Sequence, residues 1–411
     1  MELKRWKQYC LCSLGGSFPE DVVPTQALFA PLVLLVHRDP QRSRGCFAVS
    51  SMAQVLEPED TSVLLPCPAH ESVDALHAFV AANGATVLNT AFGRAFDWLA
   101  APRPRDGFRI TLAGLGDVGS TLLTALKLLG NSLKEIRIYD PNEAQCRRYE
   151  MELNQVLERP TPRVSLAAAD TLFDCDLFLF TASRGVPPVG AAVQDVRLVQ
   201  FERNRQMLTA YAKQAREIGF NGLFCQISDP VDLLCRTVFL DSNRDASGCF
   251  DAMGLLPEQI QGFGLGVMAA RAAYYAEKNN IDFSDGRAYG PHGADLIIAD
   301  HPINYHPDIS AQLTALTVQA NLQVRALGFK PYIAPALSSA ALSILQLLRG
   351  EAHYGAVPMG GAYFGCRSRF TAAGLLTERE ALHPVLYERI RQVHARLEGF
   401  HYDPCCDTPT Q

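Results

Sequence analysis

Three glycines between Phe108 and Asp140 carry the clearest chemical signal in this sequence. They form the pattern Gly114-x-Gly116-x-x-Gly119. In such a pattern the first glycine allows a tight turn, the second lets a pyrophosphate approach the main chain, and the third allows close packing of a helix. Because the free N–H groups at a helix N-terminus attract anions, the pattern predicts a site for the phosphates of a dinucleotide.

The carboxylate of Asp140 indicates which dinucleotide binds. An acid at the end of the second strand accepts hydrogen bonds from the ribose hydroxyls of NAD and repels the additional phosphate of NADP. A glycine turn alone is often only structural, but two strands, a helix and a terminal acid around it favour nucleotide binding. We therefore expect NAD as the cofactor. The binding residues predicted in this stretch are Gly114, Gly116, Asp117, Val118, Gly119 and Asp140.

The elements around the glycine turn predict a doubly wound parallel sheet. Residues 108–112 alternate as a strand does, and leucines at helical spacing follow the turn. Residues 176–183 and 223–228 are typical of buried strands, with a helix expected between them from about Arg197 to Ile218. Ligands of such sheets bind beyond the carboxyl ends of the strands. The residues expected there, besides the glycine turn, are Thr181, Ala182, Ser183 and Asp229.

Three domains and a tail are predicted. Residues 1–105 contain short apolar segments (PLVLLV, CFAV, SVLL) that indicate strands of a small α/β domain, ended by the linker APRPRDG. Residues 106–232 form the NAD-binding domain, residues 233–402 a more helical substrate domain, and residues 403–411 a tail. The substrate domain is expected to contain helices at 267–278, 309–327, 337–348 and 378–397, the last beginning with the capping box Thr377-x-x-Glu380.

Composition excludes several classes of partner. The chain has 411 residues, 48% of them hydrophobic and 19% charged, and a net charge of −6 without any basic run, which argues against nucleic acid. The apolar run 32–36 is too short to span a bilayer, and residues 1–12 lack the layout of a secretory signal. We expect a cytoplasmic protein without a membrane partner.

Neither cysteines nor histidines indicate a metal site. The 12 cysteines include no CxxC pair, and several lie in or beside apolar strands, so we interpret them as reduced and structural. His301 and His306 are five residues apart in a loop that contains proline, which matches no helical ligand pair. No metal is expected.

From about Phe108 to Phe400, the order of motifs resembles the NAD-dependent L-lactate/malate dehydrogenase family. The matching pieces are GLGDVGS, the FTAS strand end, RLVQFERN, ISDPVD, GFGLG, GPHG and GLLTEREAL. The resemblance implies a Rossmann domain followed by an α+β substrate domain, a mobile loop over the site, and a homo-oligomer, usually a dimer or tetramer. The small N-terminal α/β domain would be an addition to this plan, and we expect it to contact any protein partner.

The resemblance also implies roles for four residues. Arg197 takes the place of the mobile-loop arginine that polarises the substrate carbonyl, and Asn204 follows it at the family's spacing. Arg271 matches the arginine that binds the substrate carboxylate with its planar fork. His292, in GPHG, matches the histidine that gives a proton to the carbonyl oxygen as hydride reaches the carbon.

Two departures from the family pattern concern the partner of His292. The family has an aspartate three residues before the carboxylate-binding arginine, where this chain has Met268, and an asparagine where this chain has Asp229. We hypothesise that Asp229 is the acidic partner of His292, or that it binds a cationic group of the substrate. An ionised Asp229 next to a plain 2-oxo acid would otherwise be repelled by the substrate carboxylate.

The segment from Thr181 to Arg197 is longer and more apolar than the family's loop, which favours a bulkier substrate than pyruvate or oxaloacetate. The function expected is therefore hydride transfer between NADH and a small carboxylate substrate, a 2-oxo acid or a related compound with a C=O or C=N group next to the carboxylate. The alternative is a catalytically impaired family member that acts as an NAD-binding, assembly or docking protein. Met268 favours the alternative, and the presence together of Arg197, Arg271 and His292 favours the enzyme.

Overall fold

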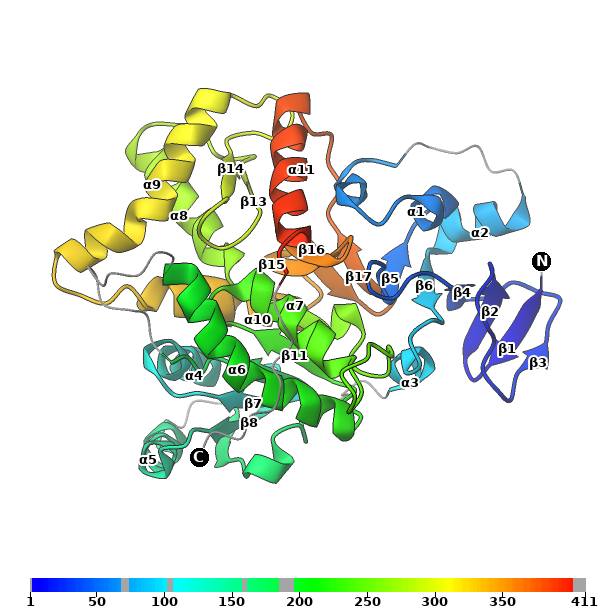
Figure 1. The fold of residues 1–411 in the computed structure, drawn as a ribbon, viewed down its shortest axis with the longest axis horizontal. Helices are drawn as coiled ribbons and strands as arrows, with labels where there is room; N and C mark the ends of the chain where they lie inside the picture. The colour runs from blue at the N-terminus through cyan, green and yellow to red at the C-terminus, as the bar shows by residue number, and fades with distance from the viewer. Residues whose placement is uncertain (1, 68–73, 102–105, 157–160, 185–195, 402–411) are drawn as a thin grey trace.

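The computed structural model describes residues 2–67, 74–101, 106–156, 161–184 and 196–401, and only the backbone of residues 196 and 197. These ranges contain a sheet of 15 strands in the order β3-β1-β2-β4-β6-β5-β17-β16-β15-β12-β11-β10-β7-β8-β9. The N-terminal strands lie at one end of the molecule and α9 at the other (Figure 1).

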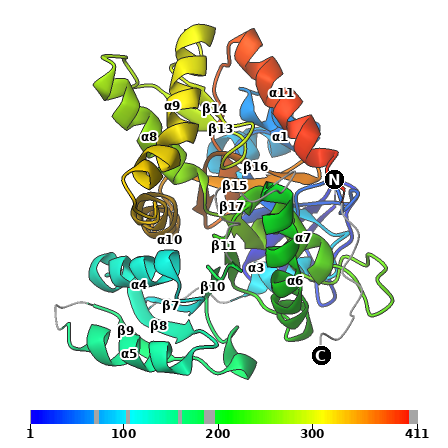
Figure 2. The same cartoon turned by 60° about the vertical axis from the view of Figure 1, so that its left-hand side comes forward.

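The middle of the chain forms the expected parallel sheet. Six neighbouring strands run parallel. The central strands β10, β11 and β12 are buried along their whole length, as is typical of a parallel sheet covered on both faces. Figure 2 shows α4 and α5 beside strands β7, β8 and β9. The α/β fold of Rossmann type is thus confirmed. The strands are β7 (Phe108–Ala113), β8 (Leu133–Tyr139), β9 (Arg163–Leu166), β10 (Leu177–Phe180), β11 (Leu223–Gln226) and β12 (Ile260–Gly262); the helices are α4 (Asp117–Leu129), α5 (Glu143–Asn154), α6 (Val196–Glu217) and α7 (Val231–Ser242).

The N-terminal region extends the same sheet. Its strand β5 pairs with β17 of the C-terminal region at Phe47 and Leu375. The predicted domain boundary near residue 105 stays a prediction. The elements are β1 (Leu3–Trp6), β2 (Tyr9–Ser13), β3 (Val23–Pro24), β4 (Leu32–Val36), β5 (Cys46–Val49), β6 (Ala85–Asn89), α1 (Met52–Leu56), the 3₁₀-helix η1 (Thr61–Leu64), α2 (Ala75–Asn83) and α3 (Ala95–Ala100).

The C-terminal region joins the parallel sheet through an antiparallel contact between β12 and β15. A long helix, α8, packs against α9 and against the π-helix η4. The elements are the short 3₁₀-helices η2 (Ala169–Thr171) and η3 (Pro257–Gln259) before it, then α8 (Leu265–Lys278), β13 (Arg287–Tyr289), β14 (Ile297–Ala299), α9 (Pro307–Ala326), η4 (Pro335–Ala341), α10 (Leu342–Leu348), β15 (His353–Met359), β16 (Ala362–Thr371), β17 (Gly374–Thr377) and α11 (Pro384–Glu398).

Two sequence predictions of secondary structure are wrong. The segment SVLL is not a strand but lies mostly in η1, because the Asp60 carboxylate accepts a hydrogen bond from the Ser62 N–H and so caps a helical turn. The helix expected from residue 378 begins only at Pro384, since Thr377 belongs to β17. The capping box is therefore absent at this position.

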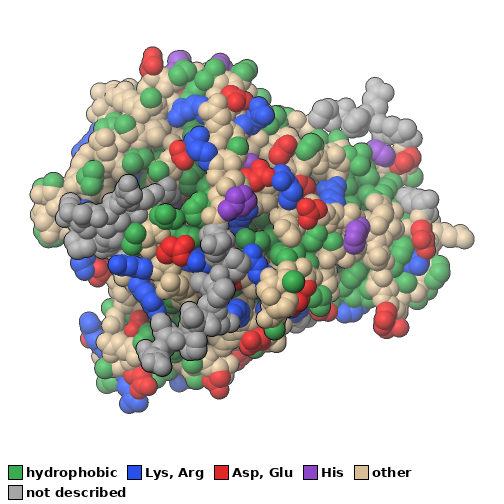
Figure 3. Space-filling view, viewed as in Figure 1, with side chains coloured by type: hydrophobic (Ala, Val, Ile, Leu, Met, Phe, Trp, Pro, Cys, Tyr) green, Lys and Arg blue, Asp and Glu red, His purple; other side chains and the backbone are tan. Residues whose placement is uncertain are grey.

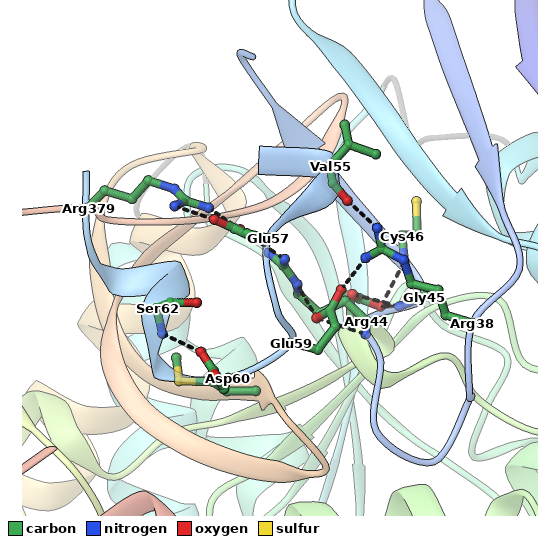
Figure 4. A network of polar contacts seen from close by, with 12 residues as sticks. Arg38, Arg44, Gly45, Cys46, Val55, Glu57, Glu59, Asp60, Ser62 and Arg379 are labelled. Carbon is green, nitrogen blue, oxygen red and sulfur yellow. Dashed lines mark hydrogen bonds and ion pairs between the residues drawn. The ribbon is translucent and has the colours of Figure 1, made fainter. Parts of the chain in front are cut away.

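Buried and partly buried charges join the N-terminal region to the rest of the chain (Figure 4). Arg44 lies between Glu57 and Glu59, with nitrogen–oxygen distances of 3.2 and 2.8 Å, and Arg379 binds Glu57 from the C-terminal region. Next to them, the fully buried Glu258 carboxylate accepts hydrogen bonds from the N–H groups of residues 45 and 46, each at 3.0 Å. The contact between the N-terminal region and the rest of the chain is therefore polar, and its charged side chains are bound by partners within the contact.

Glu258 predicts a pH dependence of stability. Burial raises its pKa to about 7, although the N–H donors and Arg44 oppose that rise. Between the ordinary value of 4.5 and about 7, the folded chain therefore binds more protons than the unfolded chain, so this group's contribution to the free energy of unfolding falls as pH rises. We expect the difference in unfolding free energy between wild type and Glu258→Gln to decrease by on the order of 3 kcal/mol from pH 4.5 to pH 7.5.

Urea unfolding of both proteins across this range provides the measurement. The difference between the two is needed because buried His353, whose pKa is lowered to about 4, changes the stability with pH in the opposite sense. A difference that does not vary with pH would contradict the role assigned to Glu258.

On the outer surface, acidic and basic side chains are interspersed over the face seen in Figure 3. Pairs such as Arg396 with Asp295, 2.9 Å apart, neutralise one another locally. Among the helices of the described ranges, none combines the length and apolar character that crossing a bilayer requires.

Candidate active site

The glycine turn has the geometry that a dinucleotide requires. Gly114 has a φ of +103°, and a Cβ there would lie 2.5 Å from the main-chain nitrogen of Ala182. A Cβ on Gly119 would lie 2.0 Å from the Gly114 oxygen. At Gly116, by contrast, no atom lies within 4 Å of such a Cβ, so the main chain is open to a ligand. Two of the glycines are thus required by packing, and the third leaves space for phosphates.

Helix α4 and Asp140 complete this end of the site. The N-cap of α4, Gly116, has no side-chain cap, so the N–H groups of the first turn can bind an anion. The Asp140 carboxylate accepts hydrogen bonds from the N–H groups of Leu115 at 2.8 Å and Asn142 at 2.9 Å, which fixes it at the end of β8 beside the turn. These residues fit NAD, with the phosphates at α4 and a ribose at Asp140.

Residues at the end of β10 form the wall next to the glycine turn. Thr181 is buried, and its hydroxyl donates to the Gly114 carbonyl at 2.6 Å. The Ala182 carbonyl accepts a hydrogen bond from the Ser228 hydroxyl at 2.7 Å, while Ser183 is exposed. Thr181 and Ala182 therefore shape the turn through packing, and Val118 packs against the core on the α4 side.

His292 lies next to Asp229. Its Nδ1 is 2.7 Å from Asp229 Oδ1, and its main-chain N–H donates to Asp232 at 3.3 Å. A Cβ on Gly264, the N-cap of α8, would lie 2.9 Å from the His292 Cβ. The absence of a side chain at Gly264 therefore leaves room for the imidazole beside the start of α8. Nε2 is buried and has no hydrogen-bond partner among the described residues. With Nδ1 held by a carboxylate, Nε2 is the nitrogen available for proton transfer.

Arg271 provides a positive charge from α8. Its Nη2 donates to Asn321 Oδ1 at 2.5 Å, and its Nη1 is 3.9 Å from the sulfur of Met268. Burial lowers the pKa of Arg271, and Tyr275 and Asp229 oppose this shift. The Asp229 charge therefore acts on Arg271, and the same carboxylate contacts His292.

Asn204 is completely buried and connects two segments of the site. Its Oδ1 accepts a hydrogen bond from the Arg184 N–H at 3.1 Å, and its Nδ2 donates to the Asp229 carbonyl at 2.8 Å. The structure thus gives it main-chain contacts, and the substrate contact remains a prediction. Arg197 lies in the first turn of α6, but its side chain and the preceding loop, residues 185–195, are outside the described residues.

These contacts form a path from the glycine turn to the imidazole. The Gly114 carbonyl is hydrogen-bonded to Thr181, and the next residue after Thr181, Ala182, is hydrogen-bonded to Ser228. The residue after Ser228, Asp229, contacts the imidazole of His292. The path crosses the carboxyl ends of β7, β10 and β11, where ligands of such sheets bind. A cavity of about 880 Å³ lies at the opposite ends of these strands, lined by residues such as Gly107, Asp176 and Gly222, and is separate from this site. The described residues contain no group of three or more His, Cys, Asp and Glu that could hold a metal ion.

Sequence reasoning missed Asn321 and Asp232. Asn321 lies on α9, 50 residues from Arg271, and its sequence neighbours give no signal of that contact. Asp232 is buried in the first turn of α7 and holds the main chain of His292. The sequence did offer a signal for it, because it is the last residue of ISDPVD.

Comparison with known proteins supports the assignment of the cofactor domain. Residues 108–250 match the family model for the lactate/malate dehydrogenase NAD-binding domain. L-lactate dehydrogenase 1 of Enterococcus faecalis is 28% identical over 47% of this chain, and L-lactate dehydrogenase of Latilactobacillus sakei is 27% identical over 61%. The matched part spans 55% of the first relative's length and 71% of the second's.

Solved structures share the fold. The minor L-lactate dehydrogenase of Enterococcus mundtii has a TM-score of 0.59 at 17% identity, covering 72% of this chain and 97% of that chain. Malate dehydrogenase of Archaeoglobus fulgidus in complex with NADH has a TM-score of 0.57 at 15% identity, covering 70% and 97%. Residues 108–250, whose glycines and acid fit NAD, thus match the NAD-binding domain of the lactate/malate dehydrogenase family, and the solved structures share the fold of this part and of the chain beyond it.

Proposed function

We propose that this chain is an oxidoreductase that transfers hydride between NADH and a 2-oxo acid or a related compound with a C=O or C=N group next to a carboxylate. One observation carries the proposal. The imidazole of His292 is held by Asp229 at 2.7 Å with Nε2 buried and unbonded among the described residues, at the end of a contact path that begins at the glycine turn. A family member that had lost its chemistry would have no need for this pairing.

NADH, when bound, supplies the hydride. His292 holds the proton at Nε2 and gives it to the substrate oxygen or nitrogen, because a free alkoxide is too high in energy to form at neutral pH. Asp229 fixes the tautomer through Nδ1 and stabilises the imidazolium. Arg271 binds the substrate carboxylate with both nitrogens of its fork. Arg197 would polarise the carbonyl, as the resemblance implies.

The position of Asp229 bears on the substrate. A carboxylate about 4 Å from another negative group is repelled by roughly 4 kcal/mol at an effective dielectric of about 20. The imidazole offsets the Asp229 charge when it carries the proton that it gives to the substrate, and the Arg271 guanidinium also interacts with that charge, so a substrate carboxylate at Arg271 is tolerated. A protonated C=N group would be attracted by the same arrangement. Asp229 therefore admits a 2-oxo acid, and it favours a substrate with a cationic C=N group over plain pyruvate or oxaloacetate.

Met268 favours a second candidate function. It is 3% exposed and places a thioether where the family pattern has the acid that partners the histidine. A chain that binds NAD but has lost turnover, and serves in assembly or docking, would tolerate this residue. The two candidates differ in one measurable property, namely turnover.

The test is NADH binding by calorimetric titration, followed by absorbance assays of NADH consumption with a panel of 2-oxo acids and cyclic imines. The proposal predicts that NADH binds and that at least one bulky member of the panel is reduced faster than pyruvate and oxaloacetate. Tight NADH binding with no turnover of any member would favour the assembly or docking role.

Asn321 predicts an effect on substrate binding. Replacing it by alanine removes the hydrogen bond that orients the Arg271 guanidinium, so we expect KM for the substrate to rise about 10-fold, with kcat changing less than threefold. Gln323→Ala is the matched control, because Gln323 lies on the same helix and binds the Tyr275 hydroxyl instead. An equal rise of KM in both variants would show that α9, and not this contact, is responsible.

A further inference from the structure

An ion pair at the cofactor helix connects Asp117, one of the predicted cofactor-binding residues, to a distant segment of the chain. Lys330 Nζ lies 2.9 Å from Asp117 Oδ2, although the two residues are 213 positions apart in the sequence. Both side chains are exposed, by 78% and 49% of their surface. An exposed pair of this kind contributes little to stability, so its position is more informative than its energy.

Asp117 is an unfavourable residue for the place that it occupies. It lies in the first turn of α4, directly after Gly116, where the main chain is open and no side chain caps the helix. A carboxylate stabilises a free helix N-terminus but repels a pyrophosphate that binds to the same N–H groups. A cation that neutralises Asp117 removes this repulsion.

Lys330 is held where it can do so. It lies between α9 and η4, in a segment bonded to α9 through the Phe329 N–H and the Val324 carbonyl, and η4 packs directly against α4. The ammonium has three N–H donors, of which Asp117 uses one. The hydrogen bond to Asp117 also raises the pKa of Lys330 from its already high ordinary value.

We propose that Lys330 is a cofactor-binding residue, whose ammonium neutralises Asp117 and donates a hydrogen bond to a phosphate oxygen of NAD. The pair makes the anion site neutral in the free protein, and the bound phosphate gains a charge-assisted contact. The inference concerns the cofactor only and does not depend on the identity of the substrate.

The test measures the Kd of NADH by fluorescence titration for four proteins: wild type, Lys330→Met, Asp117→Asn and the double variant. Lys330→Met should raise Kd about 10-fold, since the carboxylate then faces the phosphates alone. Asp117→Asn should lower Kd about threefold, because the ammonium then serves the phosphates alone. The double variant should lie between the two single variants.

Opposite shifts distinguish this role from a structural one, because loss of a merely structural ion pair would shift Kd in the same direction in both single variants. Reduced nicotinamide riboside, which lacks the phosphates, should bind equally to all four proteins. Lys278→Met, at an exposed lysine on α8, is the charge control. Single variants that shift the Kd of NADH in the same direction, or a Lys330→Met effect that is equal for the riboside, would overturn the proposal. Absence of turnover would not affect this result, because no substrate is present.

Discussion

Replacing His292 by asparagine is expected to lower kcat by about 10³-fold while the Kd of NADH stays within twofold of wild type. The imidazole Nε2 is the buried nitrogen left unbonded when Asp229 holds Nδ1, and asparagine cannot deliver a proton from that position. Steady-state kinetics on the best substrate from the panel, combined with NADH titration, gives both quantities.

Thermal unfolding of the His292→Asn variant is the control, because loss of the contact to Asp229 could destabilise the site. A kcat within 10-fold of wild type, in a variant that remains folded, would exclude His292 as the proton donor.

Asp229→Asn is the second substitution with a large expected effect. We expect kcat/KM to fall by at least about 10²-fold, since asparagine cannot stabilise the imidazolium or fix its tautomer as a carboxylate does. Unchanged turnover would contradict both roles considered for Asp229, as partner of the imidazole and as binder of a cationic substrate group.

The family pattern offers a matched rescue. The His292 side chain packs on Gly264, and Met268 lies one helical turn after Gly264. The Met268 sulfur faces Arg271. Adding Met268→Asp to Asp229→Asn restores the acid and the amide to their places in the family pattern. We expect at least a 10-fold recovery of kcat/KM relative to Asp229→Asn alone. No recovery would mean that the two carboxylate positions are not equivalent in this chain.

The parts of the site that could be predicted from the sequence are those in which local geometry requires a particular residue. Gly114 and Gly119 are needed because a Cβ at either would overlap main-chain atoms, and Asp140 follows its strand directly. The pairing of Asp229 with His292 follows from the sequence only as a hypothesis, because an acid is missing at Met268 and another is added at Asp229. The 2.7 Å contact between them is present in the structure, and its role in catalysis stays a prediction.

The parts that could not be predicted depend on packing between distant segments. Asn321 meets Arg271, and Lys330 meets Asp117, only because α9 and the segment after it lie across α8 and α4. A local sequence pattern also gave a wrong prediction where strand pairing determined the structure instead. Thr377 has the sequence pattern of a helix cap, but it pairs with Ser368 in the sheet, so the helix begins only at Pro384.

In the proposed reaction, a hydride passes from NADH to the carbon next to the carboxylate held by Arg271. Deuterium transfer tests it most directly, with NADH labelled at the reactive carbon of the nicotinamide and the product analysed by mass spectrometry and NMR. We expect one deuterium on the carbon adjacent to the product carboxylate, in wild type and, far more slowly, in His292→Asn. Tight binding of labelled NADH with no deuterium in the product of any panel member would contradict it.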